Sequence, residues 1–316
     1  MNVKIGSVTI PGNIFLAPMA GFTDPGFRAL CSARGASLTY TEMISAKGVC
    51  YGNAKTFALF ASDPAETIKA VQLFGSDPES LARACRDPHT RAFDIIDINC
   101  GCPVPKIVGN GDGSAMMRDM NMAEKAIGAA VEAAGDIPVT VKFRAGIDGK
   151  ATCAEFARMC EGAGAAAVTI HGRMREQYYA GQADLKYTEA VAKAVKIPVI
   201  HSGDVKDCVS CKSALDAGAA AVMIGRAALG RPGIFTEIAE RREPGKPSLG
   251  AVVADILVHM RKYADYFPKD TVAKNMRKHY GFYFKGIPDT KPLREKLMAA
   301  KAFSEAENIL QMTNNR

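Results

Sequence analysis

Residues 93–103 read FDIIDINCGCP, an apolar run that stops abruptly in a cysteine-containing turn. The first half carries isoleucine at positions 95, 96 and 98, a pattern typical of a short buried β-strand. After Asn99 the backbone has to turn, because Gly101 and Pro103 bracket Cys102. A turn at the carboxyl end of a strand lifts a side chain out of the core and into a cleft. We therefore predict that Cys102 is a working cysteine, although a free cysteine is more usually a small buried apolar residue.

Seven further short apolar runs are also predicted to be strands, and predicted helices lie between most of them. The predicted strands cover residues 14–18, 38–43, 68–74, 93–99, 137–143, 166–170, 197–201 and 220–224. The predicted helices between them include residues 79–87, 123–134, 154–162, 188–195 and 208–217. Such alternation predicts an α/β fold, a parallel (β/α)8 TIM barrel. A doubly wound open sheet is the alternative, but no G-x-G-x-x-G turn follows a strand.

Polar and special residues collect where the predicted strands end, as the active face of a barrel requires. Ser202, Gly203 and Asp204 end the seventh strand, and Gly225 and Arg226 end the eighth. Glycines let the backbone approach a ligand, and a guanidinium suits a phosphate. We predict a phosphate site there, with tight turns as the alternative role of the glycines.

Two other strand ends carry side chains that suit a heterocycle. Lys142 ends the fifth strand, and a buried ammonium needs an anionic or electron-rich partner. Gln72 ends the third strand and offers both a donor and an acceptor, although a hydrogen-bonded core glutamine is the alternative.

Length and composition favour an intracellular protein whose cysteines are reduced thiols. The chain has 316 residues, is 48% hydrophobic and contains nine cysteines, an odd number without framework spacing. It has no apolar run long enough for a bilayer, and its first residues lack a signal-peptide segment. We expect a cytoplasmic monomer without membrane attachment. Cys208 and Cys211 form a lone C-x-x-C inside a predicted helix, so we expect no metal site.

Charge is divided unevenly along the chain. Residues 241–316 hold 15 Lys/Arg and 8 Asp/Glu, whereas residues 1–240 hold 25 of each. A Pro/Gly-rich break at 241–247 reads as a linker, so we expect a barrel domain at 1–240 and a small all-helical domain at 248–316. A basic tail suggests an anionic partner such as nucleic acid, with a solvated helix face as the alternative.

The tail contains three predicted helices, at residues 252–266, 271–284 and 292–301. Lys274, Arg277 and Lys278 share one side of the second helix, and four aromatic residues follow between 280 and 284. Cations beside stacking surfaces are typical of RNA-binding faces. The aromatic residues can equally form the core of a small bundle.

Several segments in this order resemble one enzyme family. LAPMAGFTD at 16–24, VQLFG at 71–75, DINCGCP at 97–103, VKFR at 141–144, IHGR at 170–173 and IGR at 224–226 are similar to the flavin-dependent tRNA-dihydrouridine synthases. The resemblance extends through Gly286-Ile287-Pro288 into the tail and is greatest to the bacterial B-type members. It implies an FMN-bearing barrel, a helical RNA-binding domain and NADPH-driven reduction of the C5–C6 bond of a uridine in structured RNA, such as tRNA.

The resemblance also implies roles for individual residues. Cys102 matches the catalytic acid, and Cys100 matches a variable position with no role. The uracil would be held by Asn99, Arg144, His171 and Arg173. The FMN would be held by Pro18, Met19, Ala20, Gln72, Lys142, His171, Gly203, Asp204, Gly225 and Arg226. The family usually has Asn where this chain has Ser202, so the side-chain contact at Ser202 is in doubt while its backbone can still hold phosphate.

The implied chemistry gives the cysteine a clear task. Hydride passes from N5 of reduced flavin to C6 of the uracil, and Cys102 protonates C5 from the other face. A thiol with a pKa of about 8.5 is mostly protonated at neutral pH and can donate that proton. Three alternatives remain: ribosomal RNA as substrate, a flavin barrel acting on a free pyrimidine or small enone, and an RNA-binding module without catalysis.

Overall fold

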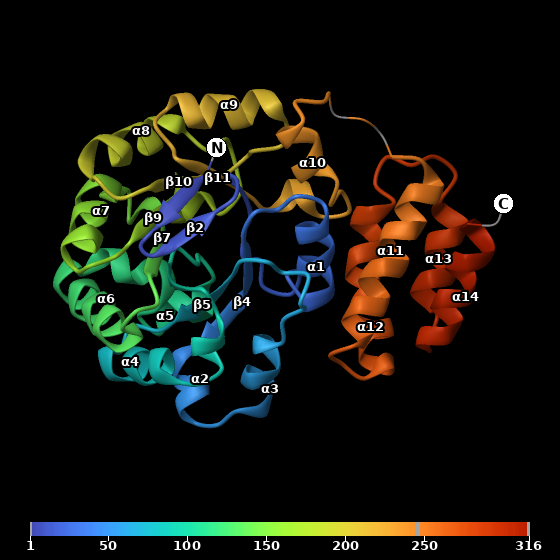
Figure 1. Ribbon diagram of the computed structural model, residues 1–316, viewed down its shortest axis with the longest axis horizontal. Helices are drawn as coiled ribbons and strands as arrows, with labels where there is room; N and C mark the ends of the chain where they lie inside the picture. The colour runs from blue at the N-terminus through green and yellow to red at the C-terminus, as the bar shows by residue number, and fades with distance from the viewer. Residues whose placement is uncertain (1, 244, 246, 315–316) are drawn as a thin grey trace.

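The structure is a computed structural model that describes residues 2–243, 245 and 247–314, with a barrel at one end and a helical bundle at the other (Figure 1). Residues 1, 315 and 316 of the two predicted domains lie outside the described residues. So do residues 244 and 246 of the predicted linker.

Eight parallel strands form the barrel. They are β3 (Ile14–Leu16), β4 (Thr39–Ser45), β5 (Lys69–Phe74), β6 (Ile95–Cys100), β7 (Val139–Ile147), β9 (Ala167–Met174), β10 (Val199–Ser202) and β11 (Ala221–Ile224). Hydrogen bonding runs in the order β3-β11-β10-β9-β7-β6-β5-β4. A parallel bridge between Phe15 and Leu38 joins the two ends of this order and closes the ring. The predicted TIM barrel is confirmed, and the open sheet is excluded.

Helices follow the strands and surround the barrel (Figure 1). They are α1 (Pro25–Ala33), α2 (Ala46–Cys50), α3 (Ala54–Phe57), α4 (Pro78–Arg86), α5 (Pro105–Gly109), α6 (Met120–Ala134), α7 (Cys153–Gly162), α8 (Leu185–Ala194), α9 (Cys208–Asp216) and α10 (Ile234–Ala239). Aspartates at 24, 77, 119, 184 and 207 cap five of them by accepting a backbone N–H, which fixes where each helix begins. A short strand, β8 (Lys150–Ala151), pairs antiparallel with β7.

A hairpin closes the amino end of the barrel. It consists of β1 (Val3–Ile5) and β2 (Val8–Ile10), which pair antiparallel, and it lies across the barrel in Figure 1. Val3, Ile5 and Ile10 are buried in one apolar cluster with Phe15 and Tyr40 from the barrel strands. Because apolar side chains fill this end, we look for the ligand site at the carboxyl ends of the strands.

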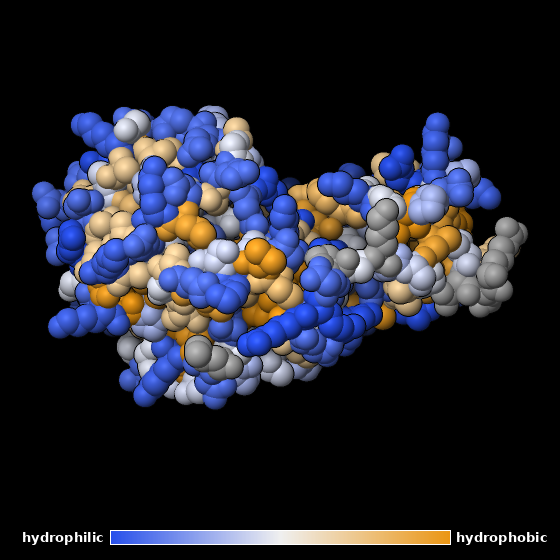
Figure 2. Space-filling model, turned by 90° about the horizontal axis from the view of Figure 1, so that it is seen from above, coloured by the Kyte–Doolittle hydropathy of each residue, from blue (hydrophilic) through white to orange (hydrophobic). Residues whose placement is uncertain are grey.

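The tail folds into four helices, one more than the sequence pattern predicted. They are α11 (Leu249–Ala264), α12 (Lys269–Tyr283), α13 (Lys291–Ala299) and α14 (Phe303–Asn314). The fourth was missed, although Phe303, Ala306 and Leu310 have helical spacing and are buried. The bundle forms the smaller lobe in Figure 2. No described helix has the length and apolar character that a bilayer crossing requires.

The bundle packs tightly on the barrel through α11 and α1. A side-chain carbon at Gly26 of α1 would come within 2.6 Å of the His259 carbonyl oxygen on α11. The missing side chain at Gly26 therefore lets the two helices approach closely.

Candidate active site

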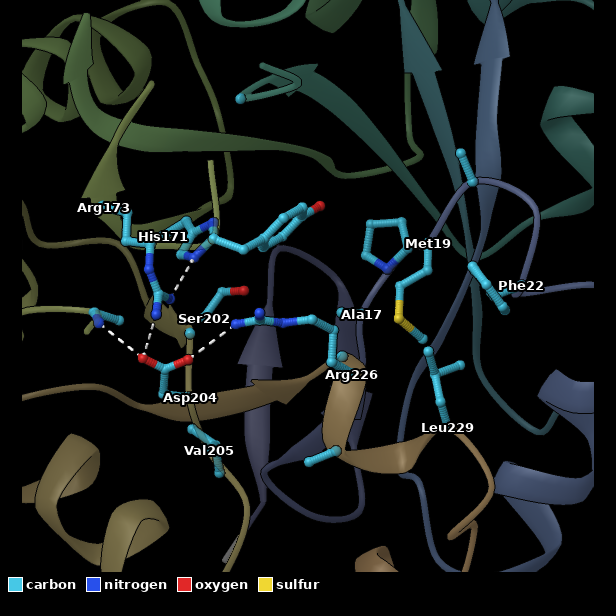
Figure 3. A pocket seen from close by; sticks show the side chains of 18 of the residues that line it. Ala17, Met19, Phe22, His171, Arg173, Ser202, Asp204, Val205, Arg226 and Leu229 are labelled. Carbon is cyan, nitrogen blue, oxygen red and sulfur yellow. Dashed lines mark hydrogen bonds and ion pairs between the residues drawn. The ribbon is translucent and has the colours of Figure 1, made fainter. Parts of the chain in front are cut away.

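A cavity of about 1540 Å³ opens at the carboxyl ends of the barrel strands and extends to α12. Part of its lining is drawn in Figure 3. The lining includes every residue that the sequence predicted for catalysis, uracil or cofactor: Pro18, Met19, Ala20, Gln72, Asn99, Cys102, Lys142, Arg144, His171, Arg173, Ser202, Gly203, Asp204, Gly225 and Arg226. The structure thus brings together groups that are spread over more than 200 positions in the chain.

Cys102 lies just beyond β6 at the cavity wall and is partly exposed. Its amide donates to Asn99 Oδ1 at 2.9 Å, and its carbonyl accepts from the Ser114 amide at 3.1 Å and from Ser114 Oγ at 2.9 Å. Burial raises the pKa of this thiol, although Arg144 and Lys142 act in the opposite direction. The thiol is therefore protonated at neutral pH and can act as an acid.

Lys142 provides a cation at the floor of the cavity. Burial and the neighbouring Arg144 lower the pKa of its ammonium to about 8. It makes no hydrogen bond to any residue that the structure describes. A half-buried ammonium without a partner favours an anionic or electron-rich ligand at this place.

His171 is held as a neutral imidazole. Burial and the cations Lys142, Arg144 and Arg173 hold the pKa of His171 well below its usual range. Nη1 of Arg173 lies 3.3 Å from His171 Nε2 (Figure 3). Because a guanidinium can only donate, Nε2 accepts and the proton of His171 is on Nδ1.

Asp204 joins two arginines beside the predicted phosphate site (Figure 3). Its carboxylate accepts from Arg173 Nη2 at 2.6 Å and from Arg226 Nη2 at 3.0 Å. The carboxylate of Asp204 therefore orients Arg226, whose side chain is half exposed and has further donors that meet no acceptor among the residues that the structure describes.

The turn at Gly203 is too crowded for any residue with a side chain. Its φ is +124°, and a side-chain carbon there would lie 2.6 Å from Ala183 Cβ and 3.0 Å from His171 Cδ2. His201 Nε2 lies 2.9 Å from the Gly203 carbonyl oxygen and fixes this turn. Ser202 ends β10 and is buried at the cavity wall.

Two arginines that the sequence predicted to contact the uracil use most of their N–H donors in hydrogen bonds to protein oxygen atoms. Arg144 donates to the carbonyl oxygens of Gly101, Met174 and Tyr178 at 2.8, 3.2 and 2.9 Å. Arg173 donates to Ala180 and Gly181 as well as to Asp204. Both side chains are buried, so their main structural effect is to hold the loop that follows β9.

The structure adds groups that sequence reasoning missed. The ring of Tyr179 contacts two guanidinium groups, and its centroid lies 5.8 Å from the guanidinium carbon of Arg144 and 4.6 Å from that of Arg226. Exposed Lys106, Lys206 and Lys285 line the cavity rim. Lys106 and Lys206 were overlooked because the barrel half of the chain has balanced charge; their places after strand ends were the available signal.

The three cations predicted for RNA do not act as one group. Lys274 and Lys278 are exposed on α12, and Lys278 Nζ lies 5.7 Å from the ring of Phe22, which lines the cavity. Arg277 is half-buried and donates to the Ala300 carbonyl oxygen at 3.0 Å. Arg277 therefore braces the α13–α14 junction.

Two further groups bear on the expectation that no metal is bound. Cys211 of the C-x-x-C pair is buried, and Cys208 Sγ lies 3.5 Å from the Arg242 carbonyl oxygen. Elsewhere, Asp24, His259 and His279 are buried together with their ligand atoms within 4.8 Å of one another. Hydrogen bonding between Asp24 and His259 accounts for part of this cluster, and the absence of a metal stays a prediction.

Comparison with known proteins identifies strong similarity over nearly the whole chain. A family model described as dihydrouridine synthase (Dus) matches residues 15–316. A probable tRNA-dihydrouridine synthase from Rickettsia bellii is 38% identical over 300 residues, covering 92% of this chain and 91% of that protein. The tRNA-dihydrouridine synthase B of Proteus vulgaris is 35% identical over 315 residues, covering 98% and 97%.

Solved structures resemble the chain in fold. Morphinone reductase aligns with a TM-score of 0.58 at 13% identity, covering 78% of this chain and 90% of that one. A variant of NCR from Zymomonas mobilis aligns with a TM-score of 0.58 at 16% identity, covering 84% and 97%. At these identities the likeness concerns the barrel architecture.

Proposed function

This chain belongs to the dihydrouridine synthase family, and from that membership we propose that it reduces the C5–C6 bond of a uridine in tRNA, with FMN as its flavin and NADPH as the electron donor. The membership makes the chain a flavin-dependent oxidoreductase. The observation that carries the proposal is one cavity that holds both a protonated thiol, Cys102, and an unpartnered cation, Lys142.

The residues present fit a flavin mononucleotide. Arg226, oriented by Asp204, offers donors to a phosphate, and the turn at Gly203, which lines the cavity, offers backbone amides. Lys142 and Gln72 would hold the ring system, which is electron-rich at its carbonyl edge. Pro18, Met19 and Ala20 of the loop after β3 would cover its other side.

When bound, the flavin would supply the hydride that is added to C6 of the uracil. Cys102 holds the proton that C5 then needs, because the raised pKa keeps its thiol protonated. His171 lines the same cavity and carries its proton on Nδ1, so it would offer a donor to negative charge that develops on the uracil carbonyls. The remaining amide hydrogen of Asn99 can serve the same edge.

A uridine inside a folded RNA must leave its stack to reach this cavity. The exposed lysines at the rim, Lys106, Lys206 and Lys285, belong to both the barrel and the helical region, and they suit the phosphates that flank the base. They support an RNA substrate over a free pyrimidine. We accordingly propose residues 1–240 as the catalytic domain and 248–316 as the RNA-binding domain of a cytoplasmic monomer.

Cys102→Ala tests the role of the acid. We expect flavin content to stay at the wild-type level, while uridine reduction in tRNA falls on the order of 10²–10⁴-fold, the usual contribution of a general acid. Dihydrouridine is measured by mass spectrometry of digested tRNA after single-turnover reaction of the prereduced enzyme.

Cys100→Ala is the matched control, since Cys100 is fully buried and lies 3.6 Å from Met116 Sδ, away from the cavity lining. It should retain activity. Near-normal reduction by Cys102→Ala would disprove the assignment of the acid. Activity on ribosomal RNA or free uridine with none on tRNA would disprove the assignment of the substrate.

A further inference from the structure

We propose that Asp97 is a positioning residue for the acid: through Gln72 and Asn99 it fixes the backbone from which the Cys102 thiol projects. The proposal rests on the proposed function only in taking Cys102 as the acid. Asp97 lies in the interior of the barrel and does not line the cavity that holds the reacting groups.

The strand register places the participants next to one another. Gln72 of β5 pairs with Asp97 of β6, and Asp97 pairs with Thr140 of β7. Two residues later along β6, Asn99 pairs with Lys142. Side chains two apart on a strand point to the same face, so Asp97 lies one layer below Asn99 inside the barrel.

Hydrogen bonding to Asp97 fixes the orientation of the Gln72 side-chain amide. Asp97 Oδ1 accepts from Thr140 Oγ1 at 2.6 Å, and Asp97 Oδ2 accepts from Gln72 Nε2 at 2.7 Å. An ionised carboxylate can only accept. Gln72 must therefore turn its nitrogen toward Asp97 and its oxygen toward Asn99.

The oriented Gln72 amide in turn orients Asn99, which holds the backbone of the cysteine turn. Asn99 Nδ2 donates to Gln72 Oε1 at 2.8 Å. Asn99 Oδ1 is thereby left to accept from the amides of Gly101 at 3.1 Å and Cys102 at 2.9 Å. If either side-chain amide flipped, a donor would face a donor, so the whole relay has one arrangement.

Asp97 can act as this anchor because it is an anion at neutral pH in spite of complete burial. Burial raises the pKa of Asp97 to about 6, while hydrogen bonds from Gln72 and Thr140 and the charge of Lys142 oppose the rise. The other titratable groups that interact with it are Tyr40 on β4 and Cys100 on β6.

The test combines thiol reactivity of the apoprotein with turnover. In Asp97→Ala the relay loses its anchor and the Cys102 turn loosens. We expect alkylation of Cys102 by iodoacetamide, followed by peptide mass spectrometry, to accelerate about 3- to 10-fold, the equivalent of one lost hydrogen bond. Single-turnover uridine reduction should fall by about 10-fold or more, since small misplacements of a catalytic group are costly.

Control variants separate positioning from stability. Thr140→Ser keeps the hydroxyl that donates to Asp97 and leaves the relay intact, so both rates should stay within about 2-fold of wild type. Asp97→Asn keeps an oxygen that can face Gln72, so this variant should lose less of the uridine-reduction rate than Asp97→Ala loses. If Asp97→Ala fails to fold, Gln72→Met breaks the relay one step nearer Cys102 and should accelerate alkylation equally.

A double variant distinguishes this proposal from the function it rests on. When Asp97→Ala is added to Cys102→Ala, the rate of uridine reduction should fall little below that of Cys102→Ala alone, because both changes act through one thiol. An additive loss, or unchanged alkylation in Asp97→Ala and Gln72→Met, would overturn the positioning role. Normal reduction by Cys102→Ala alone would instead overturn the assignment of the acid, while the alkylation result would still report on the relay.

Discussion

At the scale of single residues, Lys142 is the clearest sign of a ligand site. Its pKa is lowered to about 8 by burial, with Arg144 adding to the effect and Asp97 and Cys102 opposing it. The ammonium is therefore charged at pH 7 and increasingly neutral above pH 8. An anionic or electron-rich ligand gains most from the charged form.

This titration predicts the pH dependence of flavin binding. FMN affinity of the apoprotein, measured by fluorescence quenching, should be constant from about pH 7.0 to 7.5 and should weaken above about pH 8, by up to about 10-fold per pH unit. Lys142→Met should bind more weakly and lose this dependence. A flat profile in the wild-type protein would show that Lys142 does not contact the flavin.

Gly203 is the second residue whose environment makes a sharp prediction. Gly203→Ala places a carbon against Ala183 and His171 in a left-handed conformation, so the turn has to move. We expect the fraction of protein purified with flavin to fall several-fold, as read from the visible spectrum.

Gly128→Ala on α6 is the matched control, because a side-chain carbon added at Gly128 would meet nothing within 4 Å. This variant should keep its flavin and gain about 0.5–1 kcal/mol of stability, since alanine is favoured over glycine in helices. Full flavin content in Gly203→Ala would place the phosphate elsewhere.

At the scale of elements, α12 packs in the bundle with some residues and presents cations to solvent with the residues next to them. His279 and Tyr280 face the interior, Lys274 and Lys278 face solvent, and Arg277 is tied to the Ala300 carbonyl oxygen. The helix can thus meet RNA with one face only while its remaining surface supports the bundle.

The RNA-facing lysines and the packed arginine of α12 should respond differently to substitution. Lys274→Gln combined with Lys278→Gln should leave the melting temperature unchanged and reduce the slope of log K against log salt for tRNA by about 1–2, at about 0.7–0.9 per phosphate. Arg277→Gln should lower stability by about 0.5–1.5 kcal/mol, the contribution of one hydrogen bond. An unchanged slope in the double variant would indicate that RNA binds through Lys106, Lys206 and Lys285 instead.

At the scale of the whole molecule, one buried group joins the barrel to the bundle. Asp24, which caps α1, accepts from His259 Nε2 on α11 at 3.0 Å, and Asp24 Oδ2 lies 3.3 Å from His279 Nε2 on α12. Burial acts to raise the pKa of Asp24, but electrostatic attraction to the two histidines and the hydrogen bond from His259 hold it well below its usual range. Burial lowers the pKa of His279 to about 4.

Both shifts have the same consequence for stability. A histidine with a depressed folded pKa is neutral when folded, so the unfolded chain takes up the proton first as the pH falls below about 6.5. A carboxylate with a depressed pKa loses its contribution at still lower pH. The contact between barrel and bundle should therefore weaken on acidification, in a window from about pH 6.5 to 4 for His279.

His279→Asn tests this dependence. Between about pH 7.5 and 5.0 the wild-type protein should lose on the order of 2 kcal/mol through His279, since each unit of pKa difference is worth about 1.4 kcal/mol. The variant should show a shallower decline, measured by denaturant unfolding at each pH. The groups that face His279 are Asp24, His259 and Lys278, and equal declines in both proteins would assign the effect to other groups.

The sequence by itself determined the barrel, the order of its strands and the residues at their carboxyl ends. These features depend on local pattern: a strand needs a short apolar run, a helix needs its cap, and the turn at Gly101, Cys102 and Pro103 follows from residues adjacent in the chain. Because all parallel strands of a barrel end at one face, local pattern was enough to gather the site.

Only the tertiary structure decided how the polar groups are used. Arg144, Arg173 and Arg277 are cations in the sequence, and each donates to an oxygen that is more than 20 positions away in the chain: the Gly101 carbonyl, the Asp204 carboxylate and the Ala300 carbonyl, respectively. The pairing of Asp24 with His259 spans 235 positions. Hydrogen bonds form only within about 3 Å, so a donor's partner depends on which distant backbone the fold brings beside it, and no local pattern records that distance.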